Sequence, residues 1–200
     1  MAAVRTGCRR VIGQAIKFLL DRLNKALPRN SDGAAEDLFT YVRADRDDAV
    51  GFKSGAVSIL LVRIEEDTTM RPPDAYARVT VEGAHQRIAP EIRLNLYVLF
   101  VARFPDDYGR ALAQLSAVIR YFQNHRVFNE DNSEDLGKDI SLLIMELLTP
   151  TFAEQNEIWS ALRVAYQPSA LYKLKLVVFQ DAEGKSLARS REVVRTVTAY

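Results

Sequence analysis

The apolar positions of the chain recur with helical spacing in three segments. Between Arg10 and Leu27 they repeat every three or four residues, which predicts an amphipathic helix that ends before Pro28. The expected buried face of this helix consists of Ile12, Ala15, Ile16, Leu19, Leu23 and Leu27. Basic residues lie on its other side, so the pattern favours a core helix with a solvated basic face.

Two further helices are expected, one over residues 106–124 and one that starts at Thr151 and ends before Pro168. The buried face predicted for the second helix consists of Tyr108, Leu112, Leu115, Ile119 and Phe122. The third opens with Thr151-x-x-Glu154, the spacing of a capping box. Its apolar residues are Phe152, Ile158, Trp159 and Leu162.

Alternating or continuous apolar runs rich in β-branched residues predict strands. They cover residues 38–42, 56–64, 76–81, 92–104, 138–148, 171–179 and 190–200. Polar segments between them, including 45–51 and 65–75, are expected to be loops. Because only the turn at 83–90 separates the strands 76–81 and 92–104, these two are expected to pair as an antiparallel hairpin.

The predicted fold class is α+β, with one mixed, mainly antiparallel sheet flanked by about three helices. Residues 1–10 are interpreted as a leader, 11–180 as the domain and 181–200 as a C-terminal turn and strand. That last strand either pairs locally with 171–179 or serves as an assembly arm.

Composition narrows the functional classes. Of the 200 residues, 48% are hydrophobic and 26% charged, and the net charge of +1 gives no electrostatic argument for nucleic-acid binding. The single cysteine, Cys8, excludes an internal disulfide and a multi-thiolate metal site. The sequence contains no apolar run of membrane-spanning length.

No arrangement of side chains typical of catalysis is present. His85 and His125 lack metal-ligand spacing. Gly184-Lys185-Ser186 lacks the earlier glycine of a phosphate-binding loop, since position 179 is Phe. Asp106-Asp107 is expected to complement a helix dipole at a helix start. We therefore predict no catalytic, cofactor-binding or metal-binding residues and no enzymatic activity.

Four segments, taken in order, resemble a known family. They read VIGQAIKFLLDRLNKAL, SILLVRIEEDTTMR, LNLYVLFVARFPDDYGRALAQLSAVIRYFQNHRVF and LLIMELLTPTFAEQNEIWSALRVAYQPSALYKLKLVVF. Between Val11 and Phe179 the chain is similar to the tail-terminator, or cap, proteins of bacterial contractile injection systems, which are phage-tail-like particles. Four motifs together make the resemblance specific: Leu94-Asn95-Leu96-Tyr97, the helix ending Ile119-Arg120-Tyr121-Phe122, the helix centred on Trp159, and Pro168-Ser169-x-x-Tyr172-Lys173.

The resemblance implies a phage tail-terminator-like fold and a hexameric ring on the end of the tube and contractile sheath. Such a ring stops polymerisation and stabilises the last sheath layer. Its partners are further copies of itself, the sheath protein and the inner tube protein, with no cofactor and no nucleic acid. Assembly is expected in the bacterial cytoplasm, and the finished particle is either extracellular or membrane-anchored.

Five residues are predicted as assembly contacts: Val193, Arg195 and Val197 in the C-terminal strand, and Arg22 and Lys25 in the first helix. Asn95 is expected to pair across the sheet. Trp159 and Tyr172 are expected to anchor the core, and the alternative is that they are interface residues. The alternative function is an adaptor that anchors the injection apparatus to a membrane through the basic first helix.

Overall fold

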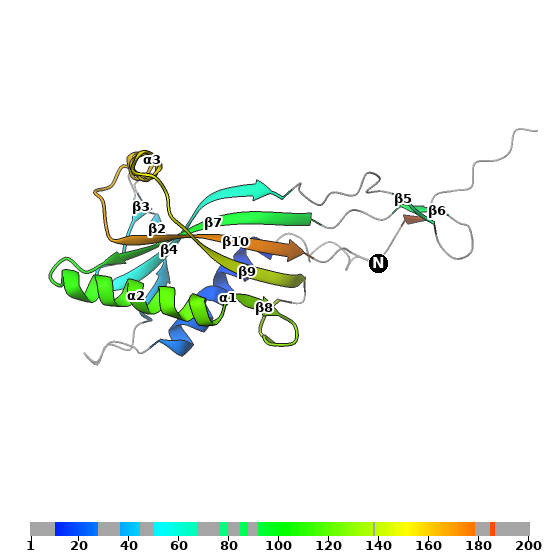
Figure 1. The fold of residues 1–200 in the computed structure, drawn as a ribbon, viewed down its shortest axis with the longest axis horizontal. Coiled ribbons are helices and arrows are strands. Elements are labelled where there is room, and N and C mark those ends of the chain that lie inside the picture. The colour runs from blue at the N-terminus through cyan, green and yellow to red at the C-terminus, as the bar shows by residue number, and fades with distance from the viewer. Residues whose placement is uncertain are drawn as a thin grey trace, which may run out of the picture.

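The structure is a computed structural model that describes residues 11–27, 37–44, 50–67, 77–79, 85–87, 92–137, 139–178 and 185–186. The helices in these ranges are α1 (Val11–Ala26), α2 (Tyr108–Asn124) and α3 (Phe152–Leu162), shown in Figure 1. The strands are β1 (Phe39–Tyr41), β2 (Arg43–Ala44), β3 (Val50–Gly51), β4 (Ala56–Glu66), β5 (Ala77–Val79), β6 (His85–Arg87), β7 (Ile92–Arg103), β8 (Val127–Asn129), β9 (Ile140–Leu148), β10 (Ser169–Val178) and β11 (Lys185–Ser186).

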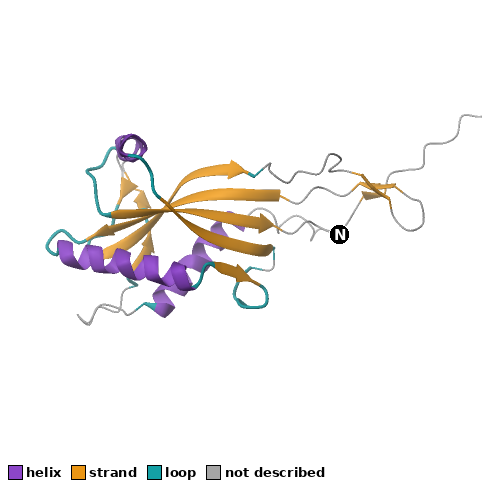
Figure 2. Cartoon of the chain, in the orientation of Figure 1, coloured by secondary structure: helices purple, strands orange, loops and turns teal. Residues whose placement is uncertain are grey.

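The main sheet has six strands in the order β1-β4-β7-β10-β9-β8 (Figure 2). β1 and β4 are parallel, and each other neighbouring pair is antiparallel. The predicted α+β fold with a mixed, mainly antiparallel sheet is therefore confirmed.

The predicted hairpin of 76–81 with 92–104 is wrong. β7 pairs with β4 and β10, whereas β5 pairs with β6, inside the expected turn. β4 and β7 are 11 and 12 residues long and apolar over much of both faces, so their pairing buries far more surface than a three-residue strand could. β11 pairs with the other edge of β6 and completes a three-stranded sheet. β2 and β3 form a separate two-stranded sheet, and β3 occupies the last two residues of the segment 45–51 expected to be a loop.

The two faces of the main sheet carry different helices. Side chains alternate along a strand, so Val98 and Phe100 of β7 lie in the core with α1 and α2, while Leu99 and Val101 lie in a smaller cluster with Trp159 of α3. We call these the α1/α2 face and the α3 face.

α1 packs into the core with a wider apolar surface than expected. Its buried residues are Val11, Ala15, Ile16, Phe18, Leu19, Leu20 and Leu23. Asn24 fixes the helix to the edge of the sheet, because its side chain donates to the Phe39 carbonyl (3.0 Å) and accepts from the Phe39 amide (2.9 Å).

α2 begins as expected but turns a different face to the sheet. Asp107 is its N-cap and accepts a hydrogen bond from the Arg110 amide at 2.8 Å. The buried residues are Ala111, Leu115, Val118, Tyr121 and Phe122, whereas Tyr108, Leu112 and Ile119 are 63%, 45% and 36% exposed. The predicted face is therefore wrong at these three positions. The small side chains of Ala111 and Val118 allow the helix to lie closer to the sheet on their side.

α3 has the predicted capping box, with hydrogen bonds between Thr151 and Glu154 in both directions. Trp159 is buried, as expected, and its ring lies 6.0 Å from that of Phe52. Phe152, however, is 93% exposed, although it is one of the apolar residues of this helix. As the first residue of the helix it projects beyond the turn that packs on the sheet.

The two remaining core predictions have different outcomes. Tyr172 is 2% exposed, which confirms its place in the core, and burial raises its pKa to about 12. Asn95 is also buried, but within the described residues its Oδ1 atom has no hydrogen-bond partner. This oxygen therefore makes no hydrogen bond across the sheet, and the pairing expected for the Asn95 side chain stays a prediction.

Candidate assembly interface

The described residues that the sequence offers as catalytic or ligand-binding candidates take part in helix capping and strand pairing. His125 is the C-cap of α2, and its ring stacks on Tyr121 with centroids 4.6 Å apart. Lys185 and Ser186 form β11 and pair with β6 rather than opening a helix. Among the described residues, no group of three or more His, Cys, Asp or Glu side chains could hold a metal ion.

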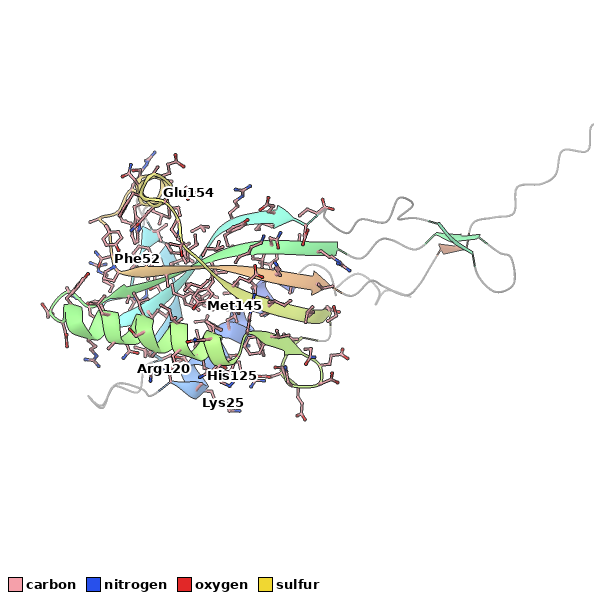
Figure 3. All side chains as sticks on the ribbon, viewed as in Figure 1. Lys25, Phe52, Arg120, His125, Met145 and Glu154 are labelled. Atoms are coloured by element: carbon pink, nitrogen blue, oxygen red, sulfur yellow. The ribbon has the colours of Figure 1, made fainter. Side chains whose placement is uncertain are left out.

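Only part of the predicted contact set falls within the described residues. Val193, Arg195 and Val197 lie outside them. Arg22 forms an ion pair with Asp135, and its guanidinium lies over the Phe18 ring, 5.2 Å from the centroid. Because its side chain is only 25% exposed, Arg22 ties α1 to the loop after β8 rather than presenting a free charge. Lys25 is exposed in the last turn of α1 (Figure 3).

The apolar side of α1 is occupied by the core of the domain. To insert into a membrane as an amphipathic helix, α1 would have to leave the sheet and expose that core. In the described part of the chain, no helix has the length and apolar character needed to cross a membrane. These observations favour the interpretation of α1 as a core helix.

An open groove runs on the α1/α2 face between the second half of α2 and the end of β9. We call it the α2–β9 groove, and its volume is about 650 Å³. It is lined by Ile119, Phe122, Gln123, Arg126, Met145, Glu146, Leu147, Leu148 and Tyr172. Phe122, Met145 and Tyr172 form a closed floor, each 2% exposed, whereas Ile119 and Leu147 are 36% and 49% exposed. The groove thus presents apolar side chains to solvent above an aromatic floor.

The carboxylate of Glu146, which lines this groove, is paired with two cations. Glu146 accepts hydrogen bonds from Lys175 Nζ (2.8 Å) and from the Arg126 guanidinium (3.3 Å). The hydrogen bond from Lys175 lowers the pKa of the Glu146 carboxyl below its usual range. Burial acts in the opposite direction and raises this pKa, while Arg126 lowers it further.

This ion cluster should make stability depend on pH. Because the folded-state pKa of Glu146 is lowered, its contribution is present above the usual glutamate pKa of about 4.3 and is lost as pH falls through the folded-state value. We expect the difference in melting temperature between wild type and Glu146→Gln to shrink as pH falls from neutral into this acidic range. Glu130→Gln, on the exposed turn after β8, controls for the change in net charge. A difference that stays constant over this range would contradict the assignment.

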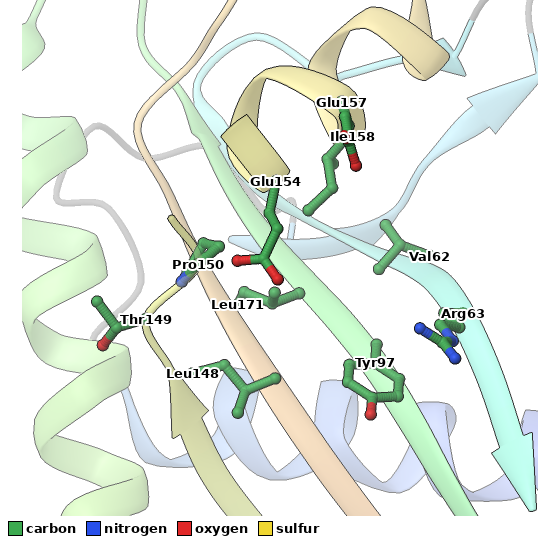
Figure 4. Close-up of a pocket in the computed structure, with 10 residues that line it drawn as sticks. All are labelled: Val62, Arg63, Tyr97, Leu148, Thr149, Pro150, Glu154, Glu157, Ile158 and Leu171. Carbon is green, nitrogen blue, oxygen red and sulfur yellow. The ribbon is translucent and has the colours of Figure 1, made fainter. Parts of the chain in front are cut away.

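A second cavity lies beneath α3 on the other face of the sheet (Figure 4). Its volume is about 440 Å³, and its lining includes Tyr97 and Glu154. Tyr97 donates a 2.6 Å hydrogen bond to Glu65, which raises the Tyr97 pKa, and Arg63 lies over its ring. Glu154 is held in the capping box. These polar groups therefore have structural partners inside the domain.

Sequence reasoning missed both the groove and the exposure of Phe152. The sequence does contain a signal for the groove, because α2 carries two adjacent rows of apolar side chains. One row is enough to pack against the sheet, so the other is left for a second contact. The row with Ala111 and Val118 meets the sheet, which leaves the row with Leu112 and Ile119 at the surface. No comparable signal marks Phe152, whose spacing fits the same pattern as the buried Trp159.

Comparison with known proteins adds the decisive observation. Residues 14–191 match the family described as the Pvc16 N-terminal domain. The chain belongs to the Pvc16 N-terminal domain family. A search of curated proteins found no match.

The fold of this Pvc16 N-terminal domain is also seen in solved structures. One is the PVC sheath/tube terminator of an extracellular contractile injection system in its extended state, with 19% identity and a TM-score of 0.53. The match covers 98% of this chain and 65% of that terminator, so this chain spans less than two thirds of its length. The tube-terminating cap of the anti-feeding prophage matches with 18% identity and a TM-score of 0.48, over 96% of this chain and 62% of the cap. The family resemblance predicted from the sequence motifs is confirmed.

Proposed function

We propose that this chain is a structural subunit that caps the end of a contractile injection particle. Copies of it form a ring, expected to be hexameric, on the end of the tube and sheath, where the ring ends polymerisation and stabilises the last sheath layer. The observation that carries this proposal is the family match over residues 14–191. The fold shared with a protein described as a sheath/tube terminator gives further support.

The polar chemistry of the described residues agrees with a structural role. Glu146, Glu154 and Tyr97 are engaged in ion pairs, a helix cap and a cross-strand hydrogen bond. The proposed partners are the sheath protein, the tube protein and further copies of the chain. We propose that it assembles in the bacterial cytoplasm and becomes part of an extracellular or membrane-anchored particle. Arg22, Lys25 and the C-terminal residues Val193, Arg195 and Val197 remain proposed contacts.

Deletion of the gene tests this function. Without a subunit that ends polymerisation, we expect sheath and tube of variable or unstable length, measured as the length distribution of particles in electron micrographs. Expression of the wild-type chain from a plasmid should restore a narrow distribution. Mutant particles with normal, uniform length would overturn the proposal.

A further inference from the structure

We infer that Phe152 of one copy packs into the α2–β9 groove of the next copy, and that this contact joins neighbouring subunits of the ring. The inference rests on the proposed ring-forming function and names the surfaces through which the copies meet. The contact involves two different patches of the same chain: an exposed aromatic side chain on α3 and an apolar groove on the opposite face of the sheet.

The backbone at Phe152 is fixed although the side chain is exposed. It is the first residue of α3, directly after the N-cap Thr151, whose amide donates to Glu154 Oε2 at 2.8 Å. The capping box therefore fixes the backbone at Phe152, while 93% of the residue surface meets solvent. An aromatic side chain held in this way loses little conformational entropy when a partner covers it, which is typical of interface anchors.

The α2–β9 groove offers the chemistry that an aromatic side chain needs. Phe122 and Tyr172 lie in its floor with ring centroids 5.2 Å apart, and Ile119 and Leu147 are exposed at its walls. A phenyl ring inserted from a neighbour would cover the exposed apolar atoms of both walls and approach the aromatic floor.

The position of the two patches favours a second copy as the occupant. α3 packs on one face of the sheet and α2 on the other (Figure 1). The groove lies beside α2. Phe152 does not occupy the groove of its own chain, since it is 93% exposed and absent from the groove lining. A ring requires a head-to-tail contact between two different patches on each subunit, and this pair of surfaces has that character.

The charges around the two patches are complementary. α3 contains Glu154 and Glu157 and no basic residue between positions 152 and 162. Arg126 and Glu146 line the groove and form an ion pair, and the exposed Arg120 lies next to Ile119 on α2, so the cations around the groove outnumber the acid. Figure 3 shows Glu154 on α3 and Arg120 on α2, on opposite sides of the sheet. An acidic helix end thus meets a groove surround with a net positive charge when copies associate head to tail, which favours this orientation over contacts between like patches.

Disulfide trapping tests the contact directly. In a Cys8→Ser background, Phe152→Cys and Leu147→Cys are produced separately and then mixed, as purified protein and as caps on particles from cells that produce both. We expect a cross-linked dimer only in the mixture, and a ladder of higher oligomers when one chain carries both cysteines. Disulfides between like cysteines, or no disulfide in caps that carry both variants, would overturn the inference.

Self-association provides a second readout. Phe152→Ala should weaken association of the purified chain by about tenfold or more, measured by sedimentation, with an unchanged melting temperature. Tyr108→Ala is the matched control, because Tyr108 is an exposed aromatic residue outside the groove. Undiminished association of Phe152→Ala, or its loss of sheath binding alone, would contradict the contact. Absence of the chain from particle ends would refute the capping function and not this contact. In that case the cross-link in purified protein would still test whether Phe152 of one copy meets the α2–β9 groove of another.

Discussion

Trp159→Ala is expected to lower the free energy of unfolding by about 3–5 kcal/mol, a large part of the roughly 5–15 kcal/mol typical of a domain. Trp159 is 6% exposed and packs against Phe52 and Tyr166, with ring centroids 6.0 and 5.4 Å away. Its removal leaves a cavity where α3 meets the sheet, so the loss of assembly should follow from unfolding. Thermal or denaturant unfolding of the purified chain measures the change.

Phe152→Ala is the matched control on the same helix. Because Phe152 is 93% exposed, its truncation should change the free energy of unfolding by about 0.5 kcal/mol or less. The two aromatic residues thus separate stability from assembly. If Trp159→Ala kept the wild-type melting temperature but failed to join particles, Trp159 would be an interface residue.

Phe100→Ala should destabilise the domain to a similar degree, by about 3–5 kcal/mol, through the opposite face of the sheet. Phe100 is fully buried in β7, and its ring lies 5.7 Å from Phe122 of α2 and 5.6 Å from Tyr172 of β10. Truncation of Phe100 removes the ring through which β7 contacts both α2 and β10. Denaturant unfolding measures the effect.

Leu112→Ala, on the outer row of α2, serves as the comparison. Because Leu112 is 45% exposed, its truncation should lower the free energy of unfolding much less than Phe100→Ala does. If Leu112→Ala destabilised the domain more than Phe100→Ala, the orientation of α2 described above would be wrong.

Local patterns predicted the elements well because their causes are local. The capping box at Thr151, the acidic N-cap at Asp107 and the apolar face of α1 each depend on residues within a few turns. The strands β4, β7, β9 and β10 were visible as long apolar runs. The domain boundaries at 10 and 180 stay predictions.

Features that depend on distant parts of the chain could not be predicted in this way. The pairing of β7 with β4 rather than with 76–81 reflects competition between strands for the same edge, which a hairpin rule does not consider. The exposure of Ile119 depends on which of two apolar rows of α2 meets the sheet. Because α3 covers one face of the sheet and α2 the other, the candidate interface is known only once the topology is known.

We propose that this chain caps one end of a contractile particle, and its location on isolated particles tests this proposal most directly. Gold-labelled antibody against the chain, viewed by electron microscopy, should mark a single end of each particle, opposite the baseplate. Particles from the deletion strain should carry no label. Label along the length of the sheath, at the baseplate, or absent from intact wild-type particles would contradict the account.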